Sequence, residues 1–454
     1  MRHRRDMIFF VWIWLLFVTI SQHSLCFAAD LPGAEKILGS GDTRRRPDYD
    51  QALIDQAEAY ISNKEYSMAE RVLLGLVESR DITKKREVLY GLGRVYYYLN
   101  NFGKAKEYLT VALALDEGLD FSKETRLTQT MAGIHVYLAY VYMQGGAHEQ
   151  AIKVLVNAEK SGLAEVIRTQ FLGPNIYSLI AKNCLNIGDV TLAKEYFARS
   201  NALEITDASV AFRIKQISLL GLGSCNIILQ EYAAAIPVFK EAIERNKENK
   251  NDDFKIAAYI GLSNAYVFNG EYEKAYQECV DTLESLSAGL KKIEADYISG
   301  VIQLKRNKVK DAEGYFKRML QNIKSQGGAA INANFSVNWG LLESLAHYNL
   351  GLVALQEKQF QDAADEMNAA AAVLRGISSP VMKKKDSVIY LKIACQYGIF
   401  KSLKNQNKNE AAKESFEFLV QMIKNLGVKE REILDSKRFP MYIDGPSIAE
   451  MLKG

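Results

Sequence analysis

The sequence predicts an all-α fold, a superhelical solenoid of about nine helical hairpins stacked in chain order. Two observations predict it: an alanine recurs nine times in similar surroundings, and in eight of the nine cases a second small residue stands twelve positions before it. Small residues at a fixed offset on paired helices are what close ridge-and-groove packing requires, and self-similarity along a chain is typical of stacked repeats.

One stretch in the second repeat, LYGLGRVYYYLNNFGKAKEYLTVA, shows the unit most clearly. We expect a first helix over Leu89–Leu99, a turn at Asn100–Gly103 and a second helix over Lys104–Leu115, because the large apolar residues follow helical spacing. Gly93 is expected to leave room for a neighbouring helix, and Ala105 to lie where the two helices cross most closely.

Each repeat is identified by its recurring alanine, which we call the repeat alanine. The nine are Ala69, Ala105, Ala151, Ala193, Ala235, Ala275, Ala312, Ala363 and Ala412. The residues twelve positions earlier are Ala57, Gly93, Ala139, Ala181, Gly223, Ser263, Gly300, Gly351 and Phe400. Successive repeat alanines lie 36 to 51 positions apart, and the extra residues before several first helices are helix-like. We therefore expect extended first helices, with Asp207 as the N-cap of one of them.

The repeat resembles the tetratricopeptide (TPR) repeat, whose pattern is W-x2-L-G-x2-Y…A-x3-F…P. The second repeat carries Leu92-Gly93, Tyr96, Ala105 and Leu109 at those offsets, with Leu89 in the aromatic position and no terminal proline. Since the repeats exceed the usual 34 residues, the chain is similar to long-helix variants of the family. The resemblance implies a right-handed superhelix, in which the first helices line a concave groove that binds a partner segment.

The N-terminus has the pattern of a secretory signal peptide over residues 1–29. Basic residues Arg2–Arg5 precede an unbroken apolar run over Met7–Ile20, and Ala28 and Ala29 offer a cleavage point. The run is short for a spanning helix, although an uncleaved anchor stays an open alternative. The sequence thus predicts an exported bacterial protein, periplasmic or secreted.

Behind the signal peptide we expect three regions: a flexible leader over residues 30–48, rich in turn formers, the repeat array over 49–423, and a C-terminal capping tail over 424–454. A tail is expected because the last repeat of a solenoid otherwise exposes an apolar face. No membrane span is expected once the signal peptide is removed. The net charge of +3, or +1 after removal of residues 1–29, gives no reason to expect nucleic-acid binding.

Catalytic and cofactor motifs are not found in the sequence. It has no GK[ST] phosphate loop and no G-x-S-x-G elbow, and the two Gly-rich fragments coincide with the Leu-Gly position of the repeat. The histidines lack metal-ligand spacing. Four cysteines remain behind the signal peptide and are expected to be small buried hydrophobes, and only Cys184 and Cys225 could approach one another. We therefore predict no enzyme activity, no metal and no cofactor.

Candidate partner-binding residues follow from the resemblance, which implies that certain first-helix positions line the groove. They are Tyr90, Arg94, Tyr97 and Tyr98 in the second repeat, Tyr140 and Met143 in the third, Lys182 in the fourth and Asn264 in the sixth. The first four are the strongest candidates, because aromatic residues and arginine carry much of the energy at interfaces. Asn264 fits the carboxylate clamp of chaperone-binding TPR domains, but Ile260 stands where that clamp has lysine.

The function predicted from these features is a non-catalytic scaffold or adaptor of the cell envelope, in secretion, pilus or polysaccharide assembly. It would bind a protein or peptide partner in the groove. Two alternatives stay open: a sensor of a small ligand or glycan that stacks on the aromatic residues, and an accessory subunit of an envelope enzyme complex. A groove filled by the chain's own extended helices and tail is a further possibility at the level of structure.

Overall fold

The structure is a computed structural model, and it describes residues 49–78, 81–115, 125–170, 175–249, 251–286, 289–327, 339–377 and 386–426. The predicted signal peptide and flexible leader lie outside the described residues, as do residues 427–454 of the predicted capping tail. The described residues contain helices and no strand, so the predicted all-α class is confirmed. No helix among them is both long enough and apolar enough to cross a membrane.

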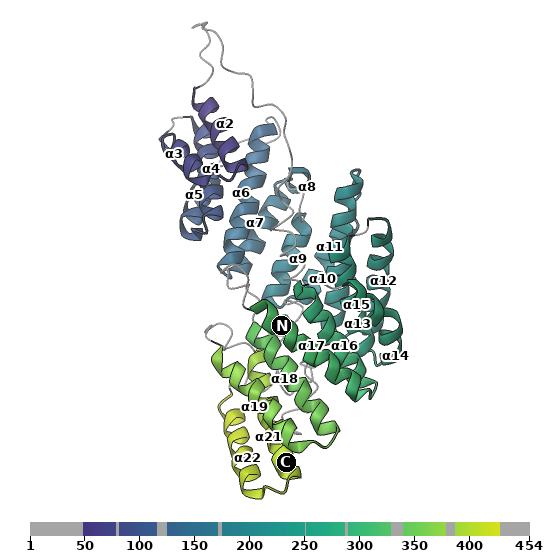
Figure 1. The fold of residues 1–454 in the computed structure, drawn as a ribbon. Coiled ribbons are helices and arrows are strands. Elements are labelled where there is room, and N and C mark those ends of the chain that lie inside the picture. Colours follow the sequence, from purple (N-terminus) through teal and green to yellow (C-terminus); the bar gives the residue numbers. More distant parts are fainter. Residues whose placement is uncertain are drawn as a thin grey trace, which may run out of the picture. The chain divides into compact units, whose positions relative to one another are not determined.

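The helices of the described residues pair into nine successive hairpins, and Figure 1 shows their order along the chain. The first four hairpins are α2 (Tyr49–Ser62) with α3 (Tyr66–Leu74), α4 (Ile82–Tyr98) with α5 (Phe102–Ala114), α6 (Thr125–Gln144) with α7 (His148–Lys160), and α9 (Ile176–Ile187) with α10 (Val190–Asn201). A short helix that the sequence did not predict, α8 (Ala164–Gln170), lies between α7 and α9.

The remaining five hairpins follow the same order. They are α11 (Ala208–Ile228) with α12 (Tyr232–Asn249), α13 (Asp252–Phe268) with α14 (Tyr272–Ala275), η2 (Tyr276–Val280) and α15 (Asp281–Leu286), α16 (Gly289–Lys305) with α17 (Val309–Gly327), α18 (Trp339–Gln356) with α19 (Phe360–Gly376), and α21 (Asp386–Asn405) with α22 (Asn409–Lys424). The described residues divide into two compact units, with those from 49 to 218 in one and those from Leu219 onward in the other.

All nine hairpins share one register. Each turn contains one residue with positive φ, always five positions before the repeat alanine: Lys64, Asn100, Gly146, Gly188, Gln230, Gly270, Asn307, Lys358 and Asn407. The repeat alanines themselves are at most 5% exposed. Only some of these turn residues are Gly or Asn, the residues that favour this conformation, so the turn position is regular in structure although its sequence is not.

The small residues of the first helices act as predicted. A Cβ built on Gly93 would lie 2.5 Å from Leu109 of the second helix, so only glycine allows that approach. Leu109 stands at position +4, counted from the repeat alanine, and in repeats one to eight the residue at +4 is at most 1% exposed. Phe239, also at +4, touches Gly223 of its own repeat and Gly261 of the next. Phe239 therefore joins its own hairpin to the next one.

Two predicted boundaries were wrong, and both have a local cause. The first helix of repeat two begins at Ile82, seven residues before the predicted Leu89, because the Asp81 side chain accepts hydrogen bonds from the backbone N–H groups of Thr83 and Lys84. The second helix begins at Phe102, inside the predicted turn, with Asn101 as its N-cap. The predicted N-cap at Asp207 is confirmed, since its carboxylate accepts from the Val210 N–H at 2.8 Å.

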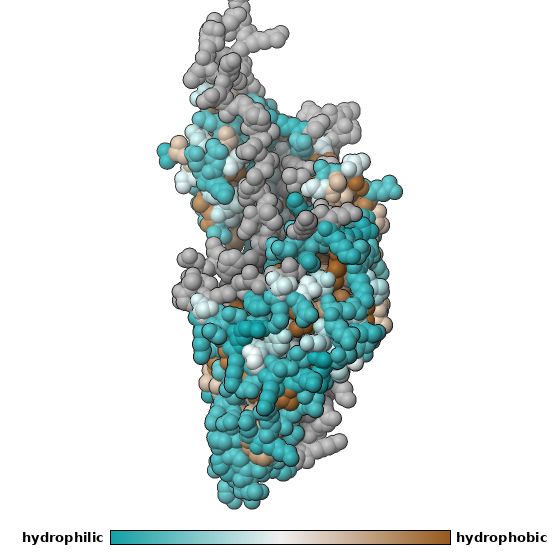
Figure 2. All heavy atoms as spheres, turned by 45° about the vertical axis from the view of Figure 1, so that its right-hand side comes forward, coloured by the Kyte–Doolittle hydropathy of each residue, from teal (hydrophilic) through white to brown (hydrophobic). Residues whose placement is uncertain are grey.

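The surface agrees with a core confined to the helix contacts. On the face drawn in Figure 2, hydrophobic residues occur singly or in small groups among hydrophilic ones.

The four cysteines predicted to be small buried hydrophobes, Cys184, Cys225, Cys279 and Cys395, are buried and form no disulfide.

Candidate functional site: a tyrosine cluster across the first three repeats

Three neighbouring helices, α3, α4 and α6, bring six tyrosines together in the unit that precedes Leu219. We call this set the tyrosine cluster; it comprises Tyr66 of α3, Tyr90, Tyr97 and Tyr98 of α4, and Tyr137 and Tyr140 of α6. Phe102 at the start of α5 extends it, with its ring centroid 5.8 Å from that of Tyr97. The cluster therefore spans repeats one, two and three.

Tyr97 stands at the centre of the cluster. Its ring centroid lies 5.5 Å from that of Tyr137, 5.6 Å from Tyr98 and 6.1 Å from Tyr140. Most of these pairs are edge-to-face, the arrangement that aromatic quadrupoles favour. Tyr97 and Tyr140 are nevertheless only partly buried, so both keep some contact with the surface.

The other members of the cluster, two of which are buried, fix the geometry. Tyr90 and Tyr137 are 7% and 8% exposed, and their ring centroids are 6.0 Å apart. The hydroxyl groups of Tyr98 and Tyr137 share a hydrogen bond of 2.6 Å, and the ring of Tyr98 stacks on that of Tyr66 at 5.1 Å. Burial raises the pKa of Tyr90 and of Tyr98, so both stay protonated across the ordinary pH range.

A glycine on the next repeat makes room for Tyr90. A Cβ at Gly133 of α6 would lie 2.1 Å from the Tyr90 hydroxyl oxygen and 2.3 Å from the ring carbon that bears it. Real atoms do not approach so closely, so α6 can pack on α4 at this point only because residue 133 has no side chain.

Arg94 lies on the buried side of the cluster and is neutralised there. Its Nη1 donates to both carboxylate oxygens of Glu58 on α2, at 2.8 and 2.7 Å. The guanidinium carbon lies 5.2 Å from the ring centroid of Tyr90 and 5.8 Å from that of Tyr137, within cation–π range. Arg94 therefore links α2 to α4 and supports the rings beside it.

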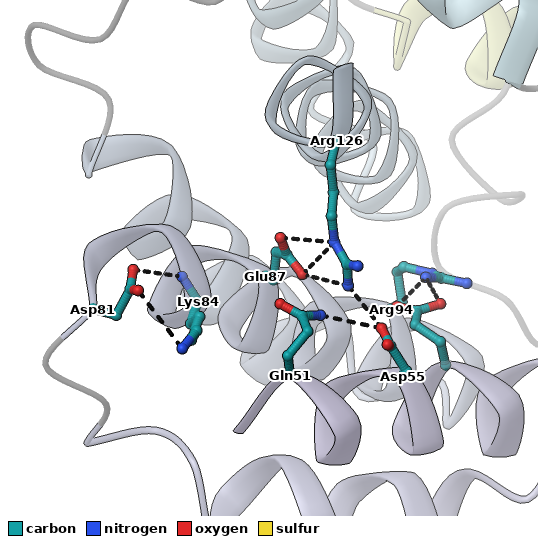
Figure 3. Close-up of polar contacts among 8 residues, drawn as sticks. Gln51, Asp55, Asp81, Lys84, Glu87, Arg94 and Arg126 are labelled. Carbon is teal, nitrogen blue, oxygen red and sulfur yellow. Dashed lines mark hydrogen bonds and ion pairs between the residues drawn. The ribbon is translucent and has the colours of Figure 1, made fainter. Parts of the chain in front are cut away.

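A second set of charged side chains, separate from the Arg94–Glu58 pair, joins the first helices α2, α4 and α6 (Figure 3). Arg126 of α6 donates from Nε to both oxygens of Glu87 on α4, at 3.0 and 2.9 Å, and from Nη2 to Asp55 on α2 at 2.9 Å. Gln51 donates to the same Asp55 carboxylate. Arg94 and Arg126 thus both have carboxylate partners within the chain.

The structure brings five of the eight predicted partner-binding residues into one cluster: Tyr90, Arg94, Tyr97, Tyr98 and Tyr140. Met143 follows Tyr140 by one helical turn and is partly exposed. Lys182 of α9 is 7% exposed, and burial lowers its pKa to about 8. Asn264 lies in the other unit and is 4% exposed, and Ile260 beside it is 2% exposed, so neither offers a side chain to a ligand in this structure.

Four residues of this site were not among the predicted partner-binding residues: Glu58, Tyr66, Phe102 and Tyr137. Two of them carried a usable signal. Glu58 directly follows Ala57, as Arg94 follows Gly93, so the two occupy the same position in successive repeats. Tyr137 precedes Tyr140 by three residues and therefore shares its helix face.

Neither metal-site geometry nor a curated relative gives information about the tyrosine cluster. Among the described residues, no group of three or more His, Cys, Asp or Glu side chains has the arrangement of a metal site. No curated protein matches the sequence.

Solved structures with a similar fold include a tetratricopeptide repeat protein from Parabacteroides merdae, at 15% identity and a TM-score of 0.42, covering 63% of this chain and 94% of that one. The apo form of the quorum sensor NprR from B. thuringiensis is 12% identical with a TM-score of 0.47, covering 82% of this chain and 98% of that one.

Two segments match models of the tetratricopeptide repeat, residues 86–119 and residues 218–249. The first covers α4 and α5, which carry much of the tyrosine cluster, and the second covers the end of α11 together with α12. Seven further hairpins repeat the same alanine offset and turn geometry. The chain is therefore a tetratricopeptide repeat protein.

Proposed function

We propose that this protein is a non-catalytic scaffold of the bacterial cell envelope that binds a segment of a partner protein or peptide at the tyrosine cluster. The observation that carries the proposal is the partial exposure of Tyr97 and Tyr140 above a fixed aromatic layer. Rings held by their neighbours lose little conformational entropy on binding, which is why tyrosine is enriched where binding energy concentrates.

The charges beside the cluster indicate what kind of segment it would bind. Arg94 is paired with Glu58, and Arg126 with Glu87 and Asp55, so a ligand carboxylate would have to displace an existing partner. Affinity would come instead from apolar and aromatic contacts, with hydrogen bonds to tyrosine hydroxyls. Met143, partly exposed one turn after Tyr140, adds an adaptable apolar side chain to the same face.

The envelope location rests on the sequence of residues 1–29, with its basic start, apolar run and Ala28-Ala29 end. A scaffold in that compartment would bring envelope components together in secretion, pilus or polysaccharide assembly. The proposal includes cleavage of the signal peptide, which removes the apolar run Met7–Ile20 from the mature protein.

The test is affinity capture from native envelope after chemical crosslinking, followed by mass spectrometry. We expect wild type to capture a defined partner that the double variant Tyr97→Ala with Tyr140→Ala loses. Tyr196→Ala is the matched control, because Tyr196 is also partly buried in the same unit but lies outside the cluster. If the double variant captured the partner as well as Tyr196→Ala does, the assignment of the tyrosine cluster as the binding site would be refuted.

A thermal-shift screen with sugars and small metabolites tests the alternative function, a small-ligand sensor. A saturable rise in melting temperature with one of them, lost in the double variant and unaccompanied by a protein partner, would replace the scaffold by a small-ligand sensor.

A further inference from the structure

Five charged side chains bond to one another across the first helices α2, α4 and α6, and their charges do not cancel. Two guanidinium groups, those of Arg94 and Arg126, are shared by three carboxylates, so the network has a net charge of −1. Arg94 pairs with Glu58. The side chain of Arg126 reaches from α6 to both Glu87 and Asp55 (Figure 3). The excess negative charge therefore lies at the end of the network that contains Arg126.

Asp55 is the member through which this excess charge is accessible. Its Oδ1 accepts hydrogen bonds from Gln51 Nε2 at 3.1 Å and from Arg126 Nη2 at 2.9 Å. None of the described residues donates a hydrogen bond to its Oδ2, and its side chain is 58% exposed. The side chain of Glu87, by contrast, is 9% exposed and has both oxygens bonded to Arg126. A ligand cation can therefore reach Asp55 without displacing a partner that is already bound.

The spacing along the helices places the network and the tyrosine cluster on the same side. On α4, Arg94 follows Glu87 by seven residues and Tyr98 follows Arg94 by four, so the three share one face. On α6, Tyr137 follows Arg126 by eleven residues, which is three turns. The guanidinium carbon of Arg94 also lies 5.8 Å from the ring centroid of Tyr137. One segment of a partner can thus contact both the tyrosines and the charged network.

We propose, building on the proposed function, that the partner segment bound at the tyrosine cluster carries a basic side chain, arginine or lysine, that pairs with Asp55. Glu87, which lies beside Asp55 across Arg126, precedes Tyr97 by ten residues, about 15 Å along the axis of α4. An extended chain spans that distance with about five residues. The basic residue of the partner is therefore about four to six positions from the apolar or aromatic residue that contacts Tyr97.

The charges of the network favour a basic segment over an acidic one. A ligand carboxylate would meet the excess negative charge, and like charges brought together at an interface oppose binding, whereas complementary charges add specificity and speed association. The protein itself contains the arrangement that we infer. The guanidinium of Arg94 is held by the Glu58 carboxylate and lies 5.2 Å from the ring centroid of Tyr90. A basic side chain of the partner would find the same two kinds of group, a carboxylate and tyrosine rings.

Selection from a phage-displayed library of random dodecapeptides tests the inference. The library is selected on the purified wild-type protein, on Asp55→Asn, on the double variant Tyr97→Ala with Tyr140→Ala, and on Glu107→Gln. Glu107→Gln is the matched control, because it removes one exposed carboxylate from α5 of the same unit, on a second helix. The melting temperature of each variant shows whether the array has kept its fold.

We expect wild type and Glu107→Gln to select peptides that combine an aromatic or apolar residue with arginine or lysine about four to six positions away. Asp55→Asn should keep the aromatic preference and lose the basic one. Peptides that depend on Tyr97 and Tyr140 but carry no basic residue, or carry an acidic one, would overturn this partner chemistry and leave the proposed function standing. If no selected peptide depended on the two tyrosines, both would fail.

Fluorescence anisotropy of the most enriched peptide then measures the pairing with Asp55. Replacing the basic residue of the peptide by glutamine should raise the Kd about threefold or more on wild type and on Glu107→Gln, and less than about twofold on Asp55→Asn. An equal loss on wild type and on Asp55→Asn would overturn the inference, because the basic residue would then bind elsewhere.

Discussion

Replacing Gly133 by alanine tests the packing of the tyrosine cluster. The added Cβ would lie 2.1 Å from the Tyr90 hydroxyl oxygen and 2.8 Å from a further ring carbon, so the ring must move. Tyr90 has little freedom to do so, because it is 7% exposed and lies against both Tyr137 and Arg94. Overpacking of this kind costs about 1–3 kcal/mol.

Alanine also improves the helix by up to about 1 kcal/mol, so the expected net effect is a loss of up to about 2 kcal/mol. Gly314→Ala is the matched control: this helical glycine of α17 has nothing within 4 Å of its Cβ position, and alanine there should stabilise by about 0.5–1 kcal/mol. The two substitutions should therefore shift the free energy of unfolding in opposite directions.

Urea titrations of the full-length protein measure the difference, and near-ultraviolet circular dichroism reports on the tyrosines. In a Tyr90→Leu background the penalty of Gly133→Ala should largely disappear, because the clashing ring is gone. If Gly133→Ala stabilised the protein as much as Gly314→Ala does, the account of how α6 packs on α4 would be refuted.

Three further predictions concern charge and processing. Glu58→Gln should cost about 1 kcal/mol, because Arg94 is mostly buried and loses its carboxylate, whereas Glu244→Gln should cost close to nothing because its pair with Lys247 is exposed; urea titration compares them. Burial lowers the pKa of Lys182 to about 8, so between pH 8 and about 10.4 the unfolded chain binds more protons there and stability rises with pH. The free energy of unfolding of wild type minus that of Lys182→Met should increase by about 3 kcal/mol over that range, and a flat difference would contradict the lowered pKa of Lys182. N-terminal sequencing of the exported protein should begin at Ala29 or Asp30, and a retained Met1 would contradict cleavage.

The fold was accessible from the sequence because its determinants are local and repeated. A repeat alanine and a small residue twelve positions earlier define each hairpin, and nine copies reveal the offset. Helix boundaries were less accessible, since the extension of α4 to Ile82 depends on one capping aspartate, Asp81. Likewise α8 is an addition to the hairpin pattern of the described residues, so the repeat pattern could not predict it.

The candidate site was accessible only in part, because it is built between repeats. Tyr90, Arg94, Tyr97 and Tyr98 stand out in one stretch of sequence, whereas their partners come from neighbouring repeats. Glu58 lies 36 positions before Arg94, and Tyr137 lies 39 positions after Tyr98. Lys182 and Asn264 occupy positions equivalent to Arg94 yet are almost fully buried, which repeat position alone does not reveal.

The most direct test of the central claim measures the affinity of the captured partner for purified variants of this protein. We expect Tyr97→Ala and Tyr140→Ala each to raise the Kd about tenfold or more, which corresponds to about 1.4 kcal/mol, and Tyr196→Ala to leave it unchanged. Equal Kd values for wild type and all three variants would contradict the assignment of the tyrosine cluster as the partner-binding site.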